Sequence, residues 1–134
     1  MGIRYESFLF VILVFTLFLC GCGRSDLPDL ASVSGVVTLD GAPSNVEVIF
    51  SPESGGHSSI GRTDAKGAYE LQYTLDAKGA IIGNHAVTIS TPLPEGGNYA
   101  GFKKSIPAKY NQKSELKVQV ESGGTRKNFE LTSK

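Results

Sequence analysis

The hydrophobic and polar positions divide the chain into an apolar amino-terminal run and a long alternating region. Residues 8–19 are apolar except for Thr16. This run is shorter than the roughly 20 residues that a membrane-spanning helix needs. From Val33 onward, short alternating runs are separated by turn residues, and no segment keeps a period of about 3.6 residues. The pattern predicts a β-rich domain behind a short hydrophobic leader.

Seven segments of the alternating region are predicted to be strands. In the second, Val46, Val48 and Phe50 point one way while Glu47 and Ser51 point the other. Antiparallel sheets that are buried on one side produce this alternation. Two such sheets predict an antiparallel seven-stranded β-sandwich, transthyretin-like or immunoglobulin-like. The predicted strands are 33–39, 46–51, 60–63, 68–74 (with Tyr69, Leu71 and Tyr73 inward), 85–91, 115–121 and a last strand with Phe129 and Leu131 inward.

The amino-terminal run has the length of the hydrophobic part of a signal peptide. Behind it, Leu19-Cys20-Gly21-Cys22 resembles the bacterial lipobox. The resemblance implies cleavage after Gly21, a diacylglyceryl group on the Cys22 thiol and an acyl chain such as palmitate on the new amino terminus. Two or more acyl chains anchor a protein stably. An ordinary secretory signal with incidental cysteines is the alternative.

These features divide the chain into three parts. We expect a lipoprotein signal peptide at 1–21, a lipidated Cys22 with a flexible tether at 22–32, and a folded domain at 33–134. The mature domain then has neither a disulfide nor a free thiol, since Cys20 leaves with the signal peptide. Gly23 follows Cys22, and by analogy with lipoproteins this disfavours retention at the inner membrane. We therefore expect a location at the outer membrane, on its periplasmic face or the cell surface.

Charge narrows the range of partners. The chain has 13 basic and 13 acidic residues and a formal net charge of zero, which does not favour nucleic-acid binding. A domain of this size can fold without disulfides, and we expect a monomer. The expected partners are the membrane, through the lipid anchor, and an unidentified envelope protein or glycan.

Three segments resemble the carboxypeptidase regulatory-like domain, a transthyretin-like (prealbumin-like) β-sandwich. They are 33–43 (VSGVVTLDGAP), 46–51 (VEVIFS) and 61–69 (GRTDAKGAY). The resemblance implies an accessory structural or binding module without peptidase chemistry. The residues that carry this motif are Gly35, Asp40, Gly41, Pro43, Asp64, Gly67 and Tyr69.

These motif residues have mechanical explanations of their own. Asp40-Gly41 is typical of a hairpin turn, and Pro43 restricts φ in the connection that follows. Asp64 can accept hydrogen bonds from backbone N–H groups across its turn, and Gly67 can adopt a positive φ. Tyr69 is expected to face the core.

No catalytic or metal-binding pattern emerges from the remaining polar residues. His57 is expected in an exposed loop, and His85 at a strand end with a backbone partner. A triad of Ser58, His85 and Asp64 lacks the context of a nucleophile elbow, and the turn at 64–67 lacks the further ligands of a calcium loop. We therefore predict that the protein is not an enzyme and holds no cofactor beyond the lipid on Cys22.

Two related activities are also disfavoured. The chain ends in LTSK, whereas transthyretin-like hydroxyisourate hydrolases end in Tyr-Arg-Gly-Ser. Adhesins with Lys–Asn isopeptide bonds need a lysine in the first strand, and 33–39 has none. Asn128 would also face outward.

The longest irregular stretch, 92–114, allows two interpretations. Its aromatic and basic side chains could bind an anionic glycan or a protein, since binding residues concentrate on loops. Alternatively, it is a solvated connection in which Ile106 and Tyr110 pack on the sandwich edge, and we favour this interpretation. The candidate binding residues are Tyr99, Phe102, Lys103, Lys104 and Lys109.

The residues together predict a lipid-anchored cell-envelope protein. Its β-sandwich is expected to be a non-catalytic module with a structural, adhesive or binding role. The alternative is a periplasmic or surface lipoprotein that binds a glycan or peptide through 92–114.

Overall fold

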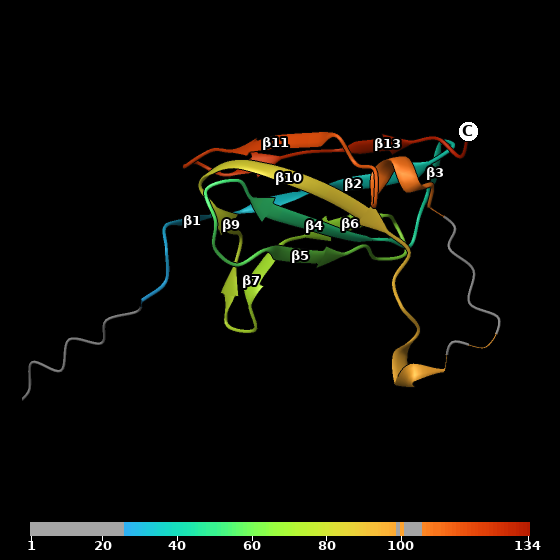
Figure 1. Ribbon diagram of the computed structural model, residues 1–134, viewed down its shortest axis with the longest axis horizontal. Coiled ribbons are helices and arrows are strands. Elements are labelled where there is room, and N and C mark those ends of the chain that lie inside the picture. The colour runs from blue at the N-terminus through green and yellow to red at the C-terminus, as the bar shows by residue number, and fades with distance from the viewer. Residues whose placement is uncertain (1–25, 99, 101–105) are drawn as a thin grey trace, which may run out of the picture.

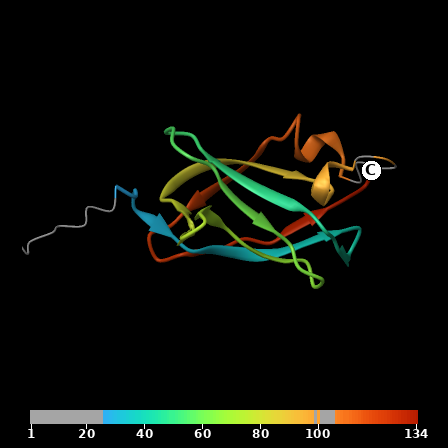
Figure 2. The same ribbon diagram turned by 90° about the horizontal axis from the view of Figure 1, so that it is seen from below.

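The protein is all-β, with two sheets facing each other across one core (Figures 1 and 2). The computed structural model describes residues 26–98, 100 and 106–134. The first sheet is antiparallel and has the order β11-β10-β4-β5-β7-β8. Its strands are β4 (Glu47–Pro52), β5 (Ser59–Arg62), β7 (Gln72–Thr74), β8 (Ala77–Lys78), β10 (Gly83–Ser90) and β11 (Leu116–Val120).

The second sheet is built around β2 (Val33–Leu39). Two strands lie on each side of β2: β3 and β6 pair with it antiparallel, whereas β12 and β13 pair with it in parallel. These strands are β3 (Ala42–Pro43), β6 (Ala68–Glu70), β12 (Thr125–Arg126) and β13 (Phe129–Leu131). A short pair, β1 (Leu30–Ala31) with β9 (Ala80–Ile81), lies where the chain enters the domain.

The core is formed by the inward residues of the alternating pattern. Phe50 is fully buried, and its ring lies 5.7 Å from His85 and 6.3 Å from Phe129, measured between ring centroids. The prediction of one buried apolar face per strand is confirmed for β2, β4, β10, β11 and β13, but not for β5, where Ser59 and Gly61 are buried and Ile60 is 45% exposed. Buried members include Val33, Val37, Val46, Val48, Tyr69, Leu71, Val87, Ile89, Val118, Val120 and Leu131.

The predicted single strand 68–74 is wrong, because the chain changes sheets at Leu71. Its first half, β6, pairs with β2, and its second half, β7, pairs with β5. Leu71 itself is fully buried, and its N–H donates to the Val33 carbonyl at 2.9 Å. Tyr73, predicted inward, is only half-buried and lies edge-on to His57 at 6.0 Å. The alternation of polar and apolar residues continues through such a crossing, so the sequence pattern cannot show where the chain changes sheets.

Two further expectations need correction. The sandwich is not wholly antiparallel, because β12 and β13 run parallel to β2. The predicted tether 22–32 is also too long. Leu30 and Ala31 form β1, Ala31 is buried, and the Ile82 N–H donates to the Asp29 carbonyl at 3.2 Å. These residues belong to the domain because β9 offers them a backbone to pair with.

The parallel strands approach β2 most closely at Gly35. A Cβ placed on Gly35 would lie 1.8 Å from the Lys127 carbonyl oxygen, in the connection between β12 and β13. The Tyr69 hydroxyl donates to this same oxygen at 2.6 Å. Beside it, the Val36 N–H donates to Asn128 Oδ1 at 3.0 Å, so this side chain bonds the β2 backbone between the two parallel pairs. We call these four residues, Gly35, Tyr69, Lys127 and Asn128, the β2 clasp.

Substituting Gly35 by Ala is expected to lower the free energy of unfolding by about 3 kcal/mol or more, because the new methyl group collides with backbone. Gly123→Ala is the matched control: nothing lies within 4 Å of its Cβ position, and it should change stability by less than about 0.5 kcal/mol. Urea unfolding measures both. Equal stability of the two variants would contradict the close approach.

The Tyr69 hydroxyl gives the clasp a pH signature. Burial raises the pKa of Tyr69 above its ordinary value, so the folded state holds this proton more tightly than the unfolded state. The stabilisation that the protonated Tyr69 hydroxyl gives the folded state is therefore complete below about pH 10, the ordinary tyrosine pKa, and is lost progressively above it. Tyr69→Phe should cost about 1–2 kcal/mol at neutral pH, because the Lys127 carbonyl loses its donor.

Above about pH 10, the stability difference between wild type and Tyr69→Phe should narrow by up to about 1.4 kcal/mol per pH unit. Urea unfolding of both proteins across alkaline pH measures this difference. Other titrating groups are common to both proteins and cancel. A constant difference would mean that Tyr69 is not buried as described.

Candidate functional site

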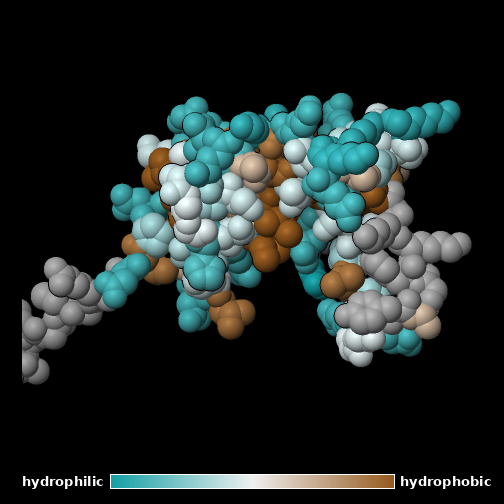
Figure 3. All heavy atoms as spheres, in the orientation of Figure 1, coloured by the Kyte–Doolittle hydropathy of each residue, from teal (hydrophilic) through white to brown (hydrophobic). Residues whose placement is uncertain are grey.

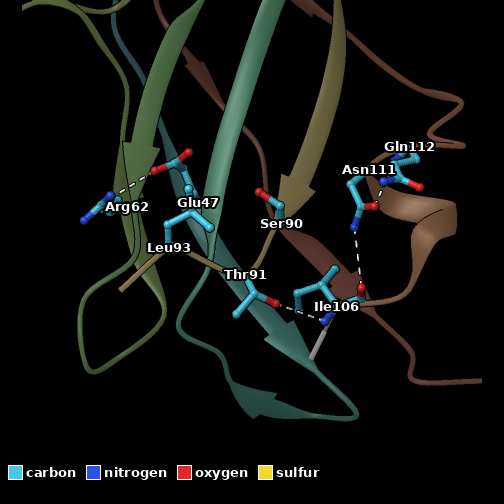
Figure 4. Close-up of a pocket in the computed structure, with 8 residues that line it drawn as sticks. All are labelled: Glu47, Arg62, Ser90, Thr91, Leu93, Ile106, Asn111 and Gln112. Atoms are coloured by element: carbon cyan, nitrogen blue, oxygen red, sulfur yellow. Dashed lines mark hydrogen bonds and ion pairs between the residues drawn. The ribbon is translucent and has the colours of Figure 1, made fainter. Parts of the chain in front are cut away.

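A cleft of about 370 Å³ lies at one end of the six-stranded sheet (Figure 4). It opens on the outer face of the sheet, since its strand residues alternate with the buried ones. The chain enters the domain beside β9, at the start of β10, whereas the cleft lies at the end of β10, on the opposite side of the domain (Figures 1 and 2). Its lining residues are Glu47, Arg62, Ser90, Thr91, Leu93, Ile106, Asn111 and Gln112.

The floor of the cleft is a polar row that the strand register sets. Ser90, Glu47 and Arg62 are consecutive partners across β10, β4 and β5. Arg62 Nε donates to Glu47 Oε2 at 3.0 Å, and Arg62 Nη1 lies 3.9 Å from Glu95 Oε1. The Arg62 side chain is 51% exposed, so this ion pair contributes little to stability.

The wall of the cleft is the returning half of the 92–114 stretch, held by Asn111. Its Nδ2 donates to the carbonyls of Ile89 at 3.3 Å and Pro107 at 3.1 Å, and its Oδ1 accepts from the Gln112 N–H at 2.8 Å. The Ile106 N–H donates to Thr91 Oγ1 at 3.3 Å. These bonds tie the wall to the end of β10, so the described part of the cleft is preformed.

The cleft combines unengaged polar groups with apolar surface. Within the described residues, the Ser90 hydroxyl and the Gln112 carboxamide make no hydrogen bond. Leu93 is 57% exposed and Ile106 contributes apolar surface. A concave surface with a few convergent polar groups and an apolar lining is suited to binding a small ligand. The arrangement offers hydrogen bonds and contact area.

Of the five binding residues predicted from the sequence, four lie outside the described residues and one lies away from the cleft. Tyr99, Phe102, Lys103 and Lys104 lie outside the described residues. Lys109 does not line the cleft. Its Nζ donates to Thr132 Oγ1 at 2.9 Å and to the Lys134 carbonyl at 2.6 Å, so it holds the carboxyl-terminal segment.

The interpretation that part of 92–114 packs on the sandwich is confirmed for its two named residues. Ile106 is 4% exposed and belongs to the core, and Tyr110 packs against the core from a half-buried position. The Thr132 N–H donates to the Tyr110 hydroxyl at 2.9 Å. Hydrogen bonds from Thr132 lower the pKa of Tyr110. This half of the stretch, which includes η3 (Ala108–Tyr110), therefore packs against the edge of the sandwich.

The turns of the family-like motif adopt the predicted geometry. Asp40 and Gly41 both have positive φ, at 52° and 84°, and join β2 to β3 in a two-residue hairpin. Asp40 Oδ1 also accepts from the Ser133 N–H at 3.0 Å, and hydrogen bonds from Ser133 lower the pKa of Asp40. Pro43 lies in β3 and is exposed, as part of the turn's second arm.

The second motif turn is also confirmed. Asp64 Oδ1 accepts from the N–H groups of Lys66 at 2.8 Å and Ala68 at 3.0 Å. Gly67 has a φ of 77°, and a Cβ there would lie 2.5 Å from the Val37 carbonyl oxygen. Both the conformation and the space therefore require glycine.

An exposed His57 and a backbone partner for His85 are confirmed, but the predicted strand-end position of His85 is wrong, because β10 begins two residues earlier and pairs on both sides at His85. His57 is exposed. His85 is fully buried within β10, and its Nε2 donates to the Ile81 carbonyl at 2.6 Å. The other members of the rejected triad are engaged elsewhere: Ser58 bonds Ser51, and Asp64 bonds its own turn. Cys22 lies outside the described residues.

Comparisons with protein-family models, curated proteins and solved structures find no match to this chain. In the part of the chain that the structure describes, no helix has the length and apolar character needed to cross a membrane. Within those same residues, no three His, Cys, Asp or Glu side chains gather where they could hold a metal ion.

Sequence reasoning found the loop but missed the sheet half of the cleft. The pattern predicts an outward Glu47, where polar residues are expected on any half-buried strand, and it does not single out Arg62 or Ser90. The placement of these three residues in one row depends on the pairing register, which alternation alone does not set. Asn111 and Gln112 carried no distinctive signal. A parity argument over paired strand ends could have linked Glu47 with Ser90.

Proposed function

We propose that this is a lipid-anchored cell-envelope protein whose β-sandwich is a non-catalytic module with a structural, adhesive or binding role. The observation that carries the proposal is that the chain entry and the cleft lie at opposite ends of the domain. The chain that follows Cys22 enters at β1, and the cleft lies at the opposite end of β10. A domain held at Cys22 would therefore present its cleft away from the membrane, toward envelope or surface partners.

The resemblance to the carboxypeptidase regulatory-like domain supports an accessory module. The two turns at Asp40-Gly41 and Asp64–Gly67 have the backbone geometry that this motif implies. The clasp gives Gly35 and Tyr69 a packing role. Six of the seven motif residues thus have fold-specifying roles and Pro43 lies in β3 beside the first turn, which fits a transthyretin-like scaffold.

The second candidate function is glycan or peptide binding at the cleft, and the composition of the cleft favours it. The cleft brings hydroxyl, carboxamide and guanidinium groups together with the apolar side chains of Leu93 and Ile106. Sugars present hydroxyl groups at their edges and C–H groups on their faces, so this mixture suits a saccharide.

The anchor predicts a difference between the two cysteines. Wild type and Cys20→Ser should partition into the detergent phase, because Cys22 still carries lipid, whereas Cys22→Ser should remain in the aqueous phase. Detergent phase separation of proteins expressed with the full leader measures this. Cys20→Ser is the matched control for loss of a thiol. Equal partitioning of wild type and Cys22→Ser would rule out the lipid anchor.

The cleft predicts a ligand that depends on its unengaged polar groups. On an array of glycans and peptides, Ser90→Ala and Gln112→Ala should each weaken the wild-type signal about tenfold, as expected for one lost hydrogen bond. Gln119→Ala, on the exposed face of β11, is the matched control and should bind like wild type. If wild type binds nothing on the array, the binding function is abandoned while the anchor stands.

A further inference from the structure

The described residues concentrate exposed apolar side chains at the end of the domain where the chain enters. Among them, five large apolar side chains are exposed: Leu93 lines the cleft, Ile60 lies within β5 opposite Ile49 of β4, and the other three lie toward the chain entry. Leu75 is the extreme case, since it is 95% exposed at the tip of the hairpin between β7 and β8. The others are Leu27 at 48%, Ile60 at 45% and Ile82 at 38%.

The β7–β8 hairpin projects from the sandwich on the side from which the amino-terminal segment leaves (Figures 1 and 2). A space-filling view shows apolar surface at the tip of this projection (Figure 3). An apolar side chain with almost its whole surface in water gains nothing from the fold. Single exposed apolar side chains are common on soluble proteins, so Leu75 supports a partner only together with Leu27 and Ile82 on the same side of the domain and with the proposed anchor nearby.

The hairpin is joined firmly to the strand that follows the anchor. Gly79, at its base, donates its N–H to the Leu71 carbonyl at 2.8 Å. A Cβ on Gly79 would lie 2.3 Å from the Ala31 carbonyl oxygen, so β1 and the hairpin base are in direct backbone contact. Next to this contact, Leu30 pairs with Ile81, and Asp29 bonds Ile82. These contacts join the base of the hairpin to β1 and its neighbours.

The distance to the anchor is short. Seven residues separate Cys22 from Leu30, so a fully extended chain places β1 no more than about 28 Å from the lipidated residue. The proposed tether is also shorter than the sequence suggested, because β1 takes up its last residues. A membrane attached to Cys22 therefore lies within reach of the hairpin tip.

We infer that the β7–β8 hairpin is a second membrane contact, with Leu75 inserting into the interfacial layer of the bilayer that holds the Cys22 lipid. The inference rests on the proposed lipid anchor. Insertion is shallow, because Asp76 follows Leu75 and Lys78 is paired with Glu70 at 3.3 Å. The hairpin tip thus contacts only the outer few ångströms of the lipid surface. With two fixed contacts, the domain stands with its cleft pointing outward.

Tryptophan fluorescence tests the inference, since the chain contains no tryptophan. Lipidated Leu75→Trp and, as matched control, lipidated Leu93→Trp are each reconstituted into phosphatidylcholine vesicles containing brominated phosphatidylcholine. The tryptophan at 75 should shift to shorter wavelength and be quenched by the brominated lipid. The tryptophan at 93, at the cleft end, should stay unshifted and unquenched. Unchanged urea unfolding midpoints confirm that both variants fold.

Each other outcome overturns the inference in a distinguishable way. If the protein floats with the vesicles but the tryptophan at 75 is not quenched, the anchor stands and the hairpin contact is wrong. Equal quenching at both positions means that the domain has no fixed orientation. If the tryptophan at 75 shifts with rising protein concentration before vesicles are added, a second copy covers the tip instead. If the protein does not float, the anchor fails and the inference with it.

Discussion

The close approach of the β12–β13 connection to strand β2 is the constraint on which the rest of the sandwich depends. Parallel strands pair with slightly less stability per residue than antiparallel ones, and two short parallel pairs would be weak alone. At Gly35 the absent side chain allows the Lys127 carbonyl to lie against β2, where Tyr69 and Asn128 bond the two chains. The carboxyl-terminal strands thereby complete the second sheet, and Phe129 and Leu131 enter the core.

The crossing at Leu71 then connects the two sheets. Because β6 pairs with β2 and β7 pairs with β5, one continuous run of chain belongs to both layers. Its fully buried leucine lies between them. The hairpin that follows is left outside the core, joined to β1 through Gly79. The geometry that closes the sandwich also leaves this hairpin projecting from it.

The two ends of the domain differ in surface chemistry, and this difference underlies both proposals. At the cleft end, paired charges, a carboxamide and a hydroxyl surround a hollow that Asn111 holds open. At the entry end, isolated apolar side chains lie beside the tether. A hollow with an apolar lining and a few polar groups suits a ligand in water, whereas an exposed leucine near the proposed lipid anchor at Cys22 suits a lipid surface. The strands of the sheet separate the two.

The sequence by itself determined the fold class, most strand positions, the buried faces and the motif turns, because period-two alternation and turn chemistry are local properties. It also supplied Cys22 and the lipobox-like leader as hypotheses. Only the tertiary structure decided that 68–74 crosses between sheets, that the last strands run parallel to β2, and that Leu30 and Ala31 belong to the domain. The tertiary structure also decided two surface features: the polar row of Ser90, Glu47 and Arg62, and the exposed hairpin tip at Leu75. Each of these depends on which strands pair and in what register. Pairing joins residues that are far apart in the chain, and a strand shows the same alternation of polar and apolar residues whichever strand it pairs with.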